Sequence, residues 1–419
     1  MMISISPSSF NGIISPNPSK SIMQRAIAIA AISHNVTTLY NWDKSNDSSN
    51  ALKIIEDIGC NIEKSQEYLR IFPNYDLKHT IWNVGESGLS TRIFSILAGL
   101  FDKTITIYGV HSLLKRPMNS LIETLTKLGL NVEHNNYHLP IEISGKITNH
   151  NIDLNLQSGS QVLTGLLIAM SKSEKDTEIN VENLTSKPYI DLTINILNQF
   201  GIKIENNNYQ NFYIQGGQKI GDSDIFIEGD WSGAAFHLVG AAISGTVTIN
   251  NLNSNSSQAD RAILNVLESV GADIKITEKS ITVSKNKLNP FVFDATDCPD
   301  LFPPLAVLAA NCTDTCKIKG VGRLTHKESD RFKTIQEEFA KCGITIHKKD
   351  DYMIIEPGNI KSAETYSYGD HRIAMALATL GLNANGDISI KDFDCVSKSY
   401  PNYFDDYSKL GGITNLKNL

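Results

Sequence analysis

Cationic and hydroxyl side chains stand directly before a very apolar segment near the start of the chain. Residues 26–32 are apolar throughout, yet Lys20, Ser21 and Arg25 precede them. A helix over this segment would present unpaired N–H groups and about half a positive charge at its N-terminus. Cations and hydroxyls gathered at such an N-terminus are typical of an anion-binding site.

The same combination recurs along the chain. Five more apolar segments occupy residues 92–100, 162–170, 234–243, 305–310 and 372–382. The starts of these apolar segments carry the polar residues Arg92, Ser160, Gln161 and Arg372. The starts of the amphipathic helices add Arg116, Ser186, Lys187, Lys327, Arg331 and Lys398. Three acids lie among these residues: Asp300, Glu328 and Asp370. One such arginine is usually solvated and one such aspartate is usually a helix cap. The whole set, gathered at helix N-termini on two facing domains, predicts a cleft for ligands with more than one phosphate or carboxylate.

A repeat of ~70 residues positions these side chains. In each repeat an amphipathic segment ends at a glycine and a strand-like alternation follows; the glycines are Gly59, Gly129, Gly201, Gly271, Gly343 and Gly411. A helix that is apolar on all sides must be enclosed, and one core rarely grows beyond ~250–300 residues. The sequence therefore predicts an α/β protein whose six repeats divide into two domains of three.

Composition and absent motifs exclude other classes. The 419 residues carry a net charge of −7 without a long basic run, which argues against a nucleic-acid surface. The cysteines at 60, 298, 312, 316, 342 and 395 are scattered as in a reducing compartment, and no His/Cys spacing completes a zinc site. No apolar run reaches ~18 residues, so we expect a soluble cytoplasmic protein. The motifs GxxxxGK[ST], GxGxxG after a strand, HExxH and GxSxG are absent.

Ten motifs, in order, resemble the EPSP synthase (3-phosphoshikimate 1-carboxyvinyltransferase) family. They are PSKSIMQR (18–25), GESGLSTR (85–92), KRPM (115–118), SGSQVLTG (158–165), SKPYIDLT (186–193), GDWSGAAF (229–236), CPDLFP (298–303), HKESDRF (326–332), YGDHRIAMALA (368–378) and SKSYPNYF (397–404). The resemblance implies a two-domain inside-out α/β barrel of six βαββαβ repeats, three per domain. One domain would span residues 19–228, and the other residues 1–18 with 229–419.

The resemblance also implies an activity. The family transfers the enolpyruvyl group of phosphoenolpyruvate to the 5-hydroxyl of shikimate 3-phosphate and releases phosphate, a step of aromatic amino-acid synthesis in the shikimate pathway. It uses no metal and no organic cofactor, and we expect a monomer that closes on its substrates. Asp300 corresponds to the base for the 5-hydroxyl, and Glu328 or Lys20 to the group that protonates the methylene carbon.

The same matching assigns binding residues. Those for phosphoenolpyruvate are Lys20, Gly88, Arg92, Arg116, Gln161, Arg331, Arg372 and Lys398. Those for shikimate 3-phosphate are Lys20, Ser21, Arg25, Ser160, Gln161, Ser186, Tyr189, Asp300 and Lys327. Arginine suits the paired oxygens of phosphate and carboxylate groups. His371 is expected to pack beside Asp370 and orient Arg372 rather than act as the base.

The chain departs from the family pattern at four places. Asn17-Pro18 replaces proline-glycine, Glu86 replaces an asparagine, Leu89 replaces a threonine and Gly159 replaces a serine. Glu86 would turn away, pair with an arginine or be protonated. Because Glu86 and Leu89 flank the phosphoenolpyruvate turn, we expect glyphosate, which occupies this site in the family, to bind differently.

Three alternative functions share part of this pattern. The sibling transferase acting on UDP-N-acetylglucosamine carries a reactive cysteine before an Arg-Pro pair, and the segment GVHSLLKRPM has none. A related repeat fold that processes RNA 3′-ends with ATP would need a basic surface. An inactive anion-binding scaffold is favoured only by Glu86, whereas Asp300 and Glu328 are both present.

Overall fold

The computed structural model describes residues 2–157, 159–278 and 280–417. The chain forms two compact units: unit 1 contains residues 1–17 and 228–419, and unit 2 contains residues 18–227. We propose that these units are the two domains expected from the repeat.

Unit 2 is built around three buried helices that contact one another, α1 (Lys20–Ile32), α3 (Gly88–Ala98) and α5 (Gln161–Met170). Every residue of α1 from Ile22 to Ile32 is buried. The amphipathic helices are α2 (Asn46–Ile58), α4 (Asn119–Lys127) and α6 (Pro188–Gln199), and a short 3-10 helix, η1, covers His111–Lys115.

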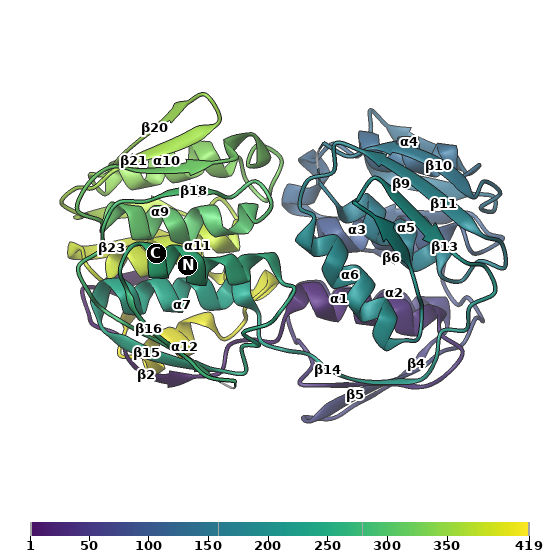
Figure 1. Ribbon diagram of the computed structural model, residues 1–419, viewed down its shortest axis with the longest axis horizontal. Helices are drawn as coiled ribbons and strands as arrows, with labels where there is room; N and C mark the ends of the chain where they lie inside the picture. Colours follow the sequence, from purple (N-terminus) through teal and green to yellow (C-terminus); the bar gives the residue numbers. More distant parts are fainter. Residues whose placement is uncertain (1, 158, 279, 418–419) are drawn as a thin grey trace. The chain divides into compact units, whose positions relative to one another are not determined.

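Three four-stranded sheets complete unit 2 (Figure 1). The first has the order β6 (Ile81–Asn83), β7 (Ile105–Tyr108), β9 (His138–Ser144), β8 (Asn131–Asn135); the second β10 (Asn151–Asn155), β11 (Thr177–Glu182), β13 (Asn211–Ile214), β12 (Glu205–Asn207); the third β14 (Ser223–Phe226), β3 (Thr37–Tyr40), β5 (Tyr68–Phe72), β4 (Asn61–Lys64). Buried and exposed residues alternate along β9 and β10, so one sheet face packs inward and the other faces outward.

Unit 1 repeats this plan. Its buried helices α7 (Trp231–Ser244), α9 (Phe302–Ala310) and α11 (His371–Gly381) contact one another, as Figure 1 shows. Outer helices are α8 (Ile263–Ser269), α10 (Arg331–Lys341) and α12 (Tyr403–Lys409), with 3-10 turns η2 (Ala259–Ala262), η3 (Pro299–Leu301), η4 (Val321–Arg323) and η5 (Phe393–Lys398).

The three sheets of unit 1 have the same strand order as those of unit 2. They are β16 (Asp273–Ile276), β17 (Ser280–Ser284), β15 (Thr246–Asn250), β2 (Asn11–Ile14); β18 (Val292–Asp294), β19 (Cys316–Lys319), β21 (Tyr352–Glu356), β20 (Thr345–Lys349); and β22 (Lys361–Tyr366), β23 (Asn385–Lys391), β1 (Met2–Ser6), β24 (Ile413–Lys417). In the last sheet β1 lies between β23 and β24 and is antiparallel to both.

The structure confirms the α/β architecture and corrects the order of elements within a repeat, which is βαβαββ rather than βαββαβ. In the middle repeat of unit 1, β18 is parallel to β19, which pairs antiparallel with β21, and β21 forms a hairpin with β20. Strands β18, β19 and β20 thus run the same way. Because parallel strands need a crossover, one helix must follow β18 and another must follow β19.

The predicted glycine caps are confirmed. All six glycines have positive φ: Gly59 122°, Gly129 88°, Gly201 82°, Gly271 89°, Gly343 83° and Gly411 92°. A left-handed residue ends each amphipathic helix and directs the chain into the next strand.

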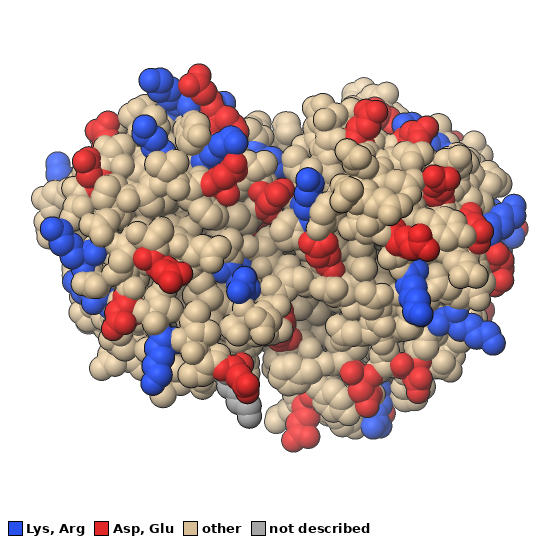
Figure 2. Space-filling model, viewed as in Figure 1, with Lys and Arg blue, Asp and Glu red and all other residues tan. Residues whose placement is uncertain are grey.

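On the face shown in Figure 2, side chains of both signs are interspersed among uncharged ones, without a continuous basic stripe. No helix in the described ranges is long and apolar enough to cross a membrane.

Candidate active site

A network of three carboxylates surrounds one buried guanidinium in unit 1. Arg331, the first residue of α10, is fully buried. It donates from Nη1 to Asp300 Oδ1 over 2.6 Å, from Nε to Asp370 Oδ2 over 2.8 Å, and from Nη2 to Glu328. Bidentate, charge-assisted contacts of this kind fix both partners strongly. Asp300 and Glu328, the two acids of unit 1 that are predicted to transfer protons, therefore both accept hydrogen bonds from one arginine.

Two carboxylates of this network reach solvent, Asp300 and Glu328. Their side chains are 20% and 18% exposed, whereas that of Arg331 is 1% exposed. Arg372 Nη2 donates to Asp300 Oδ2 over 3.0 Å, and Lys327 Nζ lies 3.4 Å from Oδ1. Burial alone would raise the pKa of Asp300, but Arg372, Lys327 and Arg331 together hold it well below its usual value. Asp300 is thus an ionised carboxylate among three cations.

Helix caps set these positions. Asp370 is the N-cap of α11 and accepts from the Arg372 N–H over 3.0 Å while it also binds Arg331. Lys398, at the end of η5, donates to the Gly369 carbonyl over 2.6 Å and so lies at the same helix start. His371 is buried, with Nδ1 4.0 Å from Asp370 Oδ1.

A second cluster forms in unit 2 around Gly88, the first residue of α3. A Cβ atom placed on Gly88 would lie 3.1 Å from Arg116 Nη1, 3.2 Å from Arg92 Nη1 and 3.5 Å from Gln161 Oε1. Side chains from α3, from the segment after η1 and from α5 therefore converge on this glycine. Burial, followed by the neighbouring charge of Arg116, lowers the pKa of Arg92 to about 10. Two crowded cations beside a bare backbone form a suitable receptor for phosphate or carboxylate.

The other predicted residues of unit 2 lie at the starts of α1, α5 and α6. Lys20, the first residue of α1, forms an ion pair with Asp47 at 2.9 Å. Ser160 is the N-cap of α5, and Ser186, just before α6, has a φ of 60°. Both serines are buried, while Ser21 and Tyr189 are partly exposed.

Comparisons with known proteins agree with each other. A sequence model of the family described as EPSP synthase (3-phosphoshikimate 1-carboxyvinyltransferase) matches residues 5–407. The 3-phosphoshikimate 1-carboxyvinyltransferase of Clostridium kluyveri is 35% identical over 414 residues, which cover 98% of this chain and 97% of that protein. Its namesake from Clostridium novyi is 34% identical over 424 residues, 98% of each chain.

The chain belongs to the EPSP synthase family.

Solved structures agree with this membership. An EPSP synthase from Acinetobacter baumannii matches the fold with a TM-score of 0.84 at 25% identity, over 100% of both chains. The enolpyruvyl transferase NikO from Streptomyces tendae, 13% identical with a TM-score of 0.79 over 99% of this chain and 98% of its own, shares the fold. Membership of the EPSP synthase family sets aside the transferase acting on UDP-N-acetylglucosamine and the RNA-processing enzyme.

Arg25 occupies an interior position in this member of the EPSP synthase family. It is 1% exposed and donates to Thr193 Oγ1 over 2.9 Å, to Thr164 Oγ1 over 3.3 Å and to the carbonyls of Ser21 and Tyr189. These bonds tie α1 to α5 and α6. Burial lowers the pKa of Arg25 to about 10, so the guanidinium stays charged at neutral pH.

Glu86, an unusual residue for the EPSP synthase family, turns toward η1. Its Oε2 accepts hydrogen bonds from the Ser112 hydroxyl over 2.7 Å and from the Ser112 N–H over 3.2 Å. These contacts fit the first of the three possibilities raised from the sequence, a carboxylate turned toward another segment. The carboxylate is used to fix the segment that precedes Arg116.

Two acids next to the predicted residues were missed. Asp47 pairs with Lys20, and Asp260 is buried in η2 near Asp300. In the ~70-residue register these residues stand at the starts of α2 and α8, the two outer helices for which we named no polar residue. The repeat itself was therefore the signal that would have found them.

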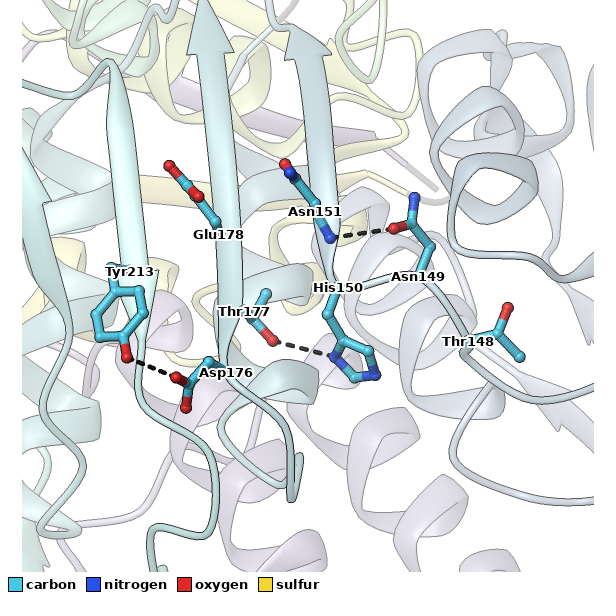
Figure 3. A pocket seen from close by; sticks show the side chains of 8 residues that line it. All are labelled: Thr148, Asn149, His150, Asn151, Asp176, Thr177, Glu178 and Tyr213. Atoms are coloured by element: carbon cyan, nitrogen blue, oxygen red, sulfur yellow. Dashed lines mark hydrogen bonds between the residues drawn. The ribbon is translucent and has the colours of Figure 1, made fainter.

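A polar pocket elsewhere in unit 2 contains none of the predicted residues. It is lined by Thr148, Asn149, His150, Asn151, Asp176, Thr177, Glu178 and Tyr213 (Figure 3). Its acid Asp176 accepts from the Tyr213 hydroxyl over 2.8 Å, and His150 Nδ1 lies 3.2 Å from Thr177 Oγ1. These bonds link the residues just before β10 and β11 to strands β11 and β13, which is a structural role.

Proposed function

We propose that this chain transfers the enolpyruvyl group of phosphoenolpyruvate to the 5-hydroxyl of shikimate 3-phosphate, with release of phosphate. Family membership supports the reaction, since the curated relatives carry the name of this transferase. The observation that carries the residue assignment is Asp300, an ionised carboxylate held by Arg331, Arg372 and Lys327 and still open to solvent.

The proposed chemistry needs three proton movements at the reacting substrate atoms. Asp300 accepts the proton of the 5-hydroxyl as that oxygen attacks C2 of phosphoenolpyruvate. Either Glu328 or Lys20 supplies a proton to the methylene carbon, which makes C2 electrophilic. The same group takes a proton back from the resulting methyl carbon when the C2–O bond to phosphate breaks, and the proton held by Asp300 leaves with the phosphate, so that both residues regain their starting states. Each well-placed proton transfer contributes roughly 10²–10⁴ in rate.

The cations are assigned to the substrate anions. Phosphoenolpyruvate is bound in unit 2 by Lys20, Arg92, Arg116, Gln161 and the Gly88 backbone. In unit 1 it is bound by Arg331, Arg372 and Lys398. Shikimate 3-phosphate is bound by Lys20, Ser21, Arg25, Ser160, Gln161, Ser186 and Tyr189, with Asp300 and Lys327. The interior position of Arg25 supports an indirect part for it, in which it holds the Ser21 carbonyl and the start of α6 in place.

A phosphate-release assay with both substrates tests the proposal. We expect Asp300→Asn to lower kcat by roughly 10²–10⁴ because the base is lost while the shape of the side chain is kept. Asp405→Asn is the matched control, since Asp405 is an exposed aspartate of the same unit. Phosphate release by Asp300→Asn at the rate of the control would remove Asp300 as the base. No release by the unaltered protein would refute the reaction itself.

A further inference from the structure

Asp260 is a buried acid that the proposed reaction does not use. It lies in η2, the turn that leads into α8, and is 1% exposed. The Ser232 hydroxyl, in the first turn of α7, donates to Oδ2. The other oxygen, Oδ1, is buried and has no hydrogen-bond partner among the described residues. A carboxylate with one donor in such a place is costly, whereas a neutral carboxylic acid is much less so.

The charges around Asp260 also favour the neutral acid. Burial, followed by the negative charge of Asp300, raises the pKa of Asp260 to about 7, and Arg372 and the Ser232 hydrogen bond oppose this rise. The titratable and charged groups that face or adjoin it are Asp230 at the start of α7, Cys298 and Asp300 around η3, Arg372 on α11, and its neighbour Arg261, which donates to the Ser254 carbonyl. Asp260 and Asp300 thus share the field of one guanidinium, that of Arg372.

We propose that Asp260 is a positioning residue that holds a proton within the electrostatic reach of the Asp300–Arg372 pair and thereby leaves Arg372 available to Asp300 and to the substrate anion. This inference rests on the proposed function, which makes Arg372 a ligand of phosphoenolpyruvate. A second carboxylate at Asp260 would compete for the same guanidinium.

Anion binding and this proton are linked. The positive charge of Arg372 lowers the pKa of Asp260. An anion on Arg372 offsets that charge, so Asp260 holds its proton more tightly and takes one up when it was ionised. At pH 7 a group with a pKa of about 7 is about half ionised, and binding draws in up to about half a proton. Above pH 7 the affinity for the anion falls as the pH rises, because binding requires Asp260 to take up a proton and the proton concentration in solution is lower.

Two measurements test the proposal on the full chain. The first needs no ligand: infrared spectra recorded from pH 5 to 9 are expected to show a protonated-carboxyl band that disappears with a midpoint near 7. Asp260→Asn should remove this band, and the control Asp405→Asn should keep it. The second is titration calorimetry with phosphoenolpyruvate, and separately with inorganic phosphate, in buffers of different ionisation enthalpy. Wild type should take up more protons at pH 7 than Asp260→Asn, with an upper limit of about half a proton per molecule.

Steady-state kinetics adds a readout that a purely structural residue would not change. The KM for phosphoenolpyruvate should rise up to tenfold per pH unit above pH 7 in wild type and stay level in Asp260→Asn. Ser232→Ala, which removes the hydrogen bond to Oδ2, should move the infrared midpoint to higher pH and keeps the test open if Asp260→Asn fails to fold.

Three outcomes would overturn the proposal. They are an infrared band unaffected by Asp260→Asn, equal proton uptake in the two proteins, and an unchanged midpoint in Ser232→Ala. Failure of the proposed function is a separate result. In that case the ligand-free band is still present and titrates near pH 7, but phosphoenolpyruvate and shikimate 3-phosphate yield no phosphate.

Discussion

Arg372 Nη2 donates to Asp300 Oδ2 over 3.0 Å. The arginine that we propose binds phosphoenolpyruvate is therefore paired with the aspartate that we propose is the base. Lys327 lies on the other oxygen of the same carboxylate, at 3.4 Å. These cations hold the pKa of Asp300 low and would make it a weak base. If, as we propose, the phosphate and carboxylate groups of the substrates bind Arg372 and Lys327, these cations are drawn from Asp300 and its basicity is expected to rise in the complex.

The first prediction concerns the acid side of the pH–rate profiles. The profile of kcat/KM reports the free enzyme and that of kcat reports the enzyme–substrate complex. We expect the acid-side pKa of kcat to be the higher of the two, because the substrates draw cations away from Asp300. Steady-state phosphate release between pH 4 and 8 should show an acid limb in kcat but none from Asp300 in kcat/KM, because the pKa of Asp300 in the free enzyme lies below this range. Coincident acid limbs would show that Asp300 keeps its cations in the complex.

The second prediction concerns the stability of unit 1. Arg331→Met leaves Asp370, which is fully buried, and Asp300 without their shared guanidinium. Removal of one partner of a buried ion pair costs about 3–5 kcal/mol. Denaturant unfolding should show this loss, while Lys333→Met, at an exposed position of the same helix, should change stability by less than about 0.5 kcal/mol. Equal losses in the two variants would contradict the prediction.

The third prediction is that substitution of Arg92 raises the stability of the protein and weakens substrate binding. Arg92 is partly buried beside Arg116, and the repulsion between the two cations contributes to the lowered pKa of Arg92. Arg92→Met removes one of two crowded cations and should raise the unfolding free energy by about 1 kcal/mol. The same change should raise the KM for phosphoenolpyruvate at least tenfold. A variant that loses both stability and affinity would show that Arg92 is mainly a packing residue.

The fourth prediction concerns His237 on α7. This histidine is fully buried, its ring stacks on Tyr403 with centroids 5.0 Å apart, and neither ring nitrogen has a hydrogen-bond partner among the described residues. Burial lowers its pKa from 6.5 to about 4. The unfolded chain therefore binds a proton more readily than the folded one, and stability falls as the pH drops from about 6.5 to 4, by about 3 kcal/mol.

His237→Phe keeps the ring contact and removes the titration. The fall in unfolding free energy between pH 7 and 4 should be about 3 kcal/mol smaller in this variant than in wild type. Substitution of the exposed His347 by glutamine serves as the control. Parallel stability curves for His237→Phe and wild type would refute a buried neutral imidazole.

The fifth prediction concerns the turn before α3. Glu86 is held by Ser112, and Leu89 is buried against the core. Glu86→Asn with Leu89→Thr should change the inhibition constant of glyphosate several-fold, because both positions flank Gly88. Competition assays against phosphoenolpyruvate measure it. An unchanged constant would show that neither residue shapes the anion site.

Much of this structure follows from local rules. The helix–glycine–strand units are predictable because each needs only a buried stripe and one left-handed residue, as at Gly129 and Gly343. Arg92, Arg116 and Gln161 come from three different elements of one unit, yet they meet at Gly88 because the repeat places their elements in register.

The remaining features depend on contacts between distant segments. The order βαβαββ follows from which strands run parallel, and that is a property of pairing rather than of periodicity. Glu86 finds Ser112 in a 3-10 turn, and Arg25 finds hydroxyls of two other helices. The burial of Asp260 cannot be predicted from periodicity either, because its neighbours come from α7 and η3.

The strand at residues 2–6 lies between β23 and β24, which are made from the last part of the chain. During synthesis this strand cannot pair with β23 and β24 until they have been translated, and the whole of unit 2 emerges from the ribosome before that point. Unit 2 is one continuous stretch and has all of its strands once residue 227 is clear. The half that carries the crowded arginines is therefore expected to fold first, and the half that carries the carboxylates follows only after translation of β24.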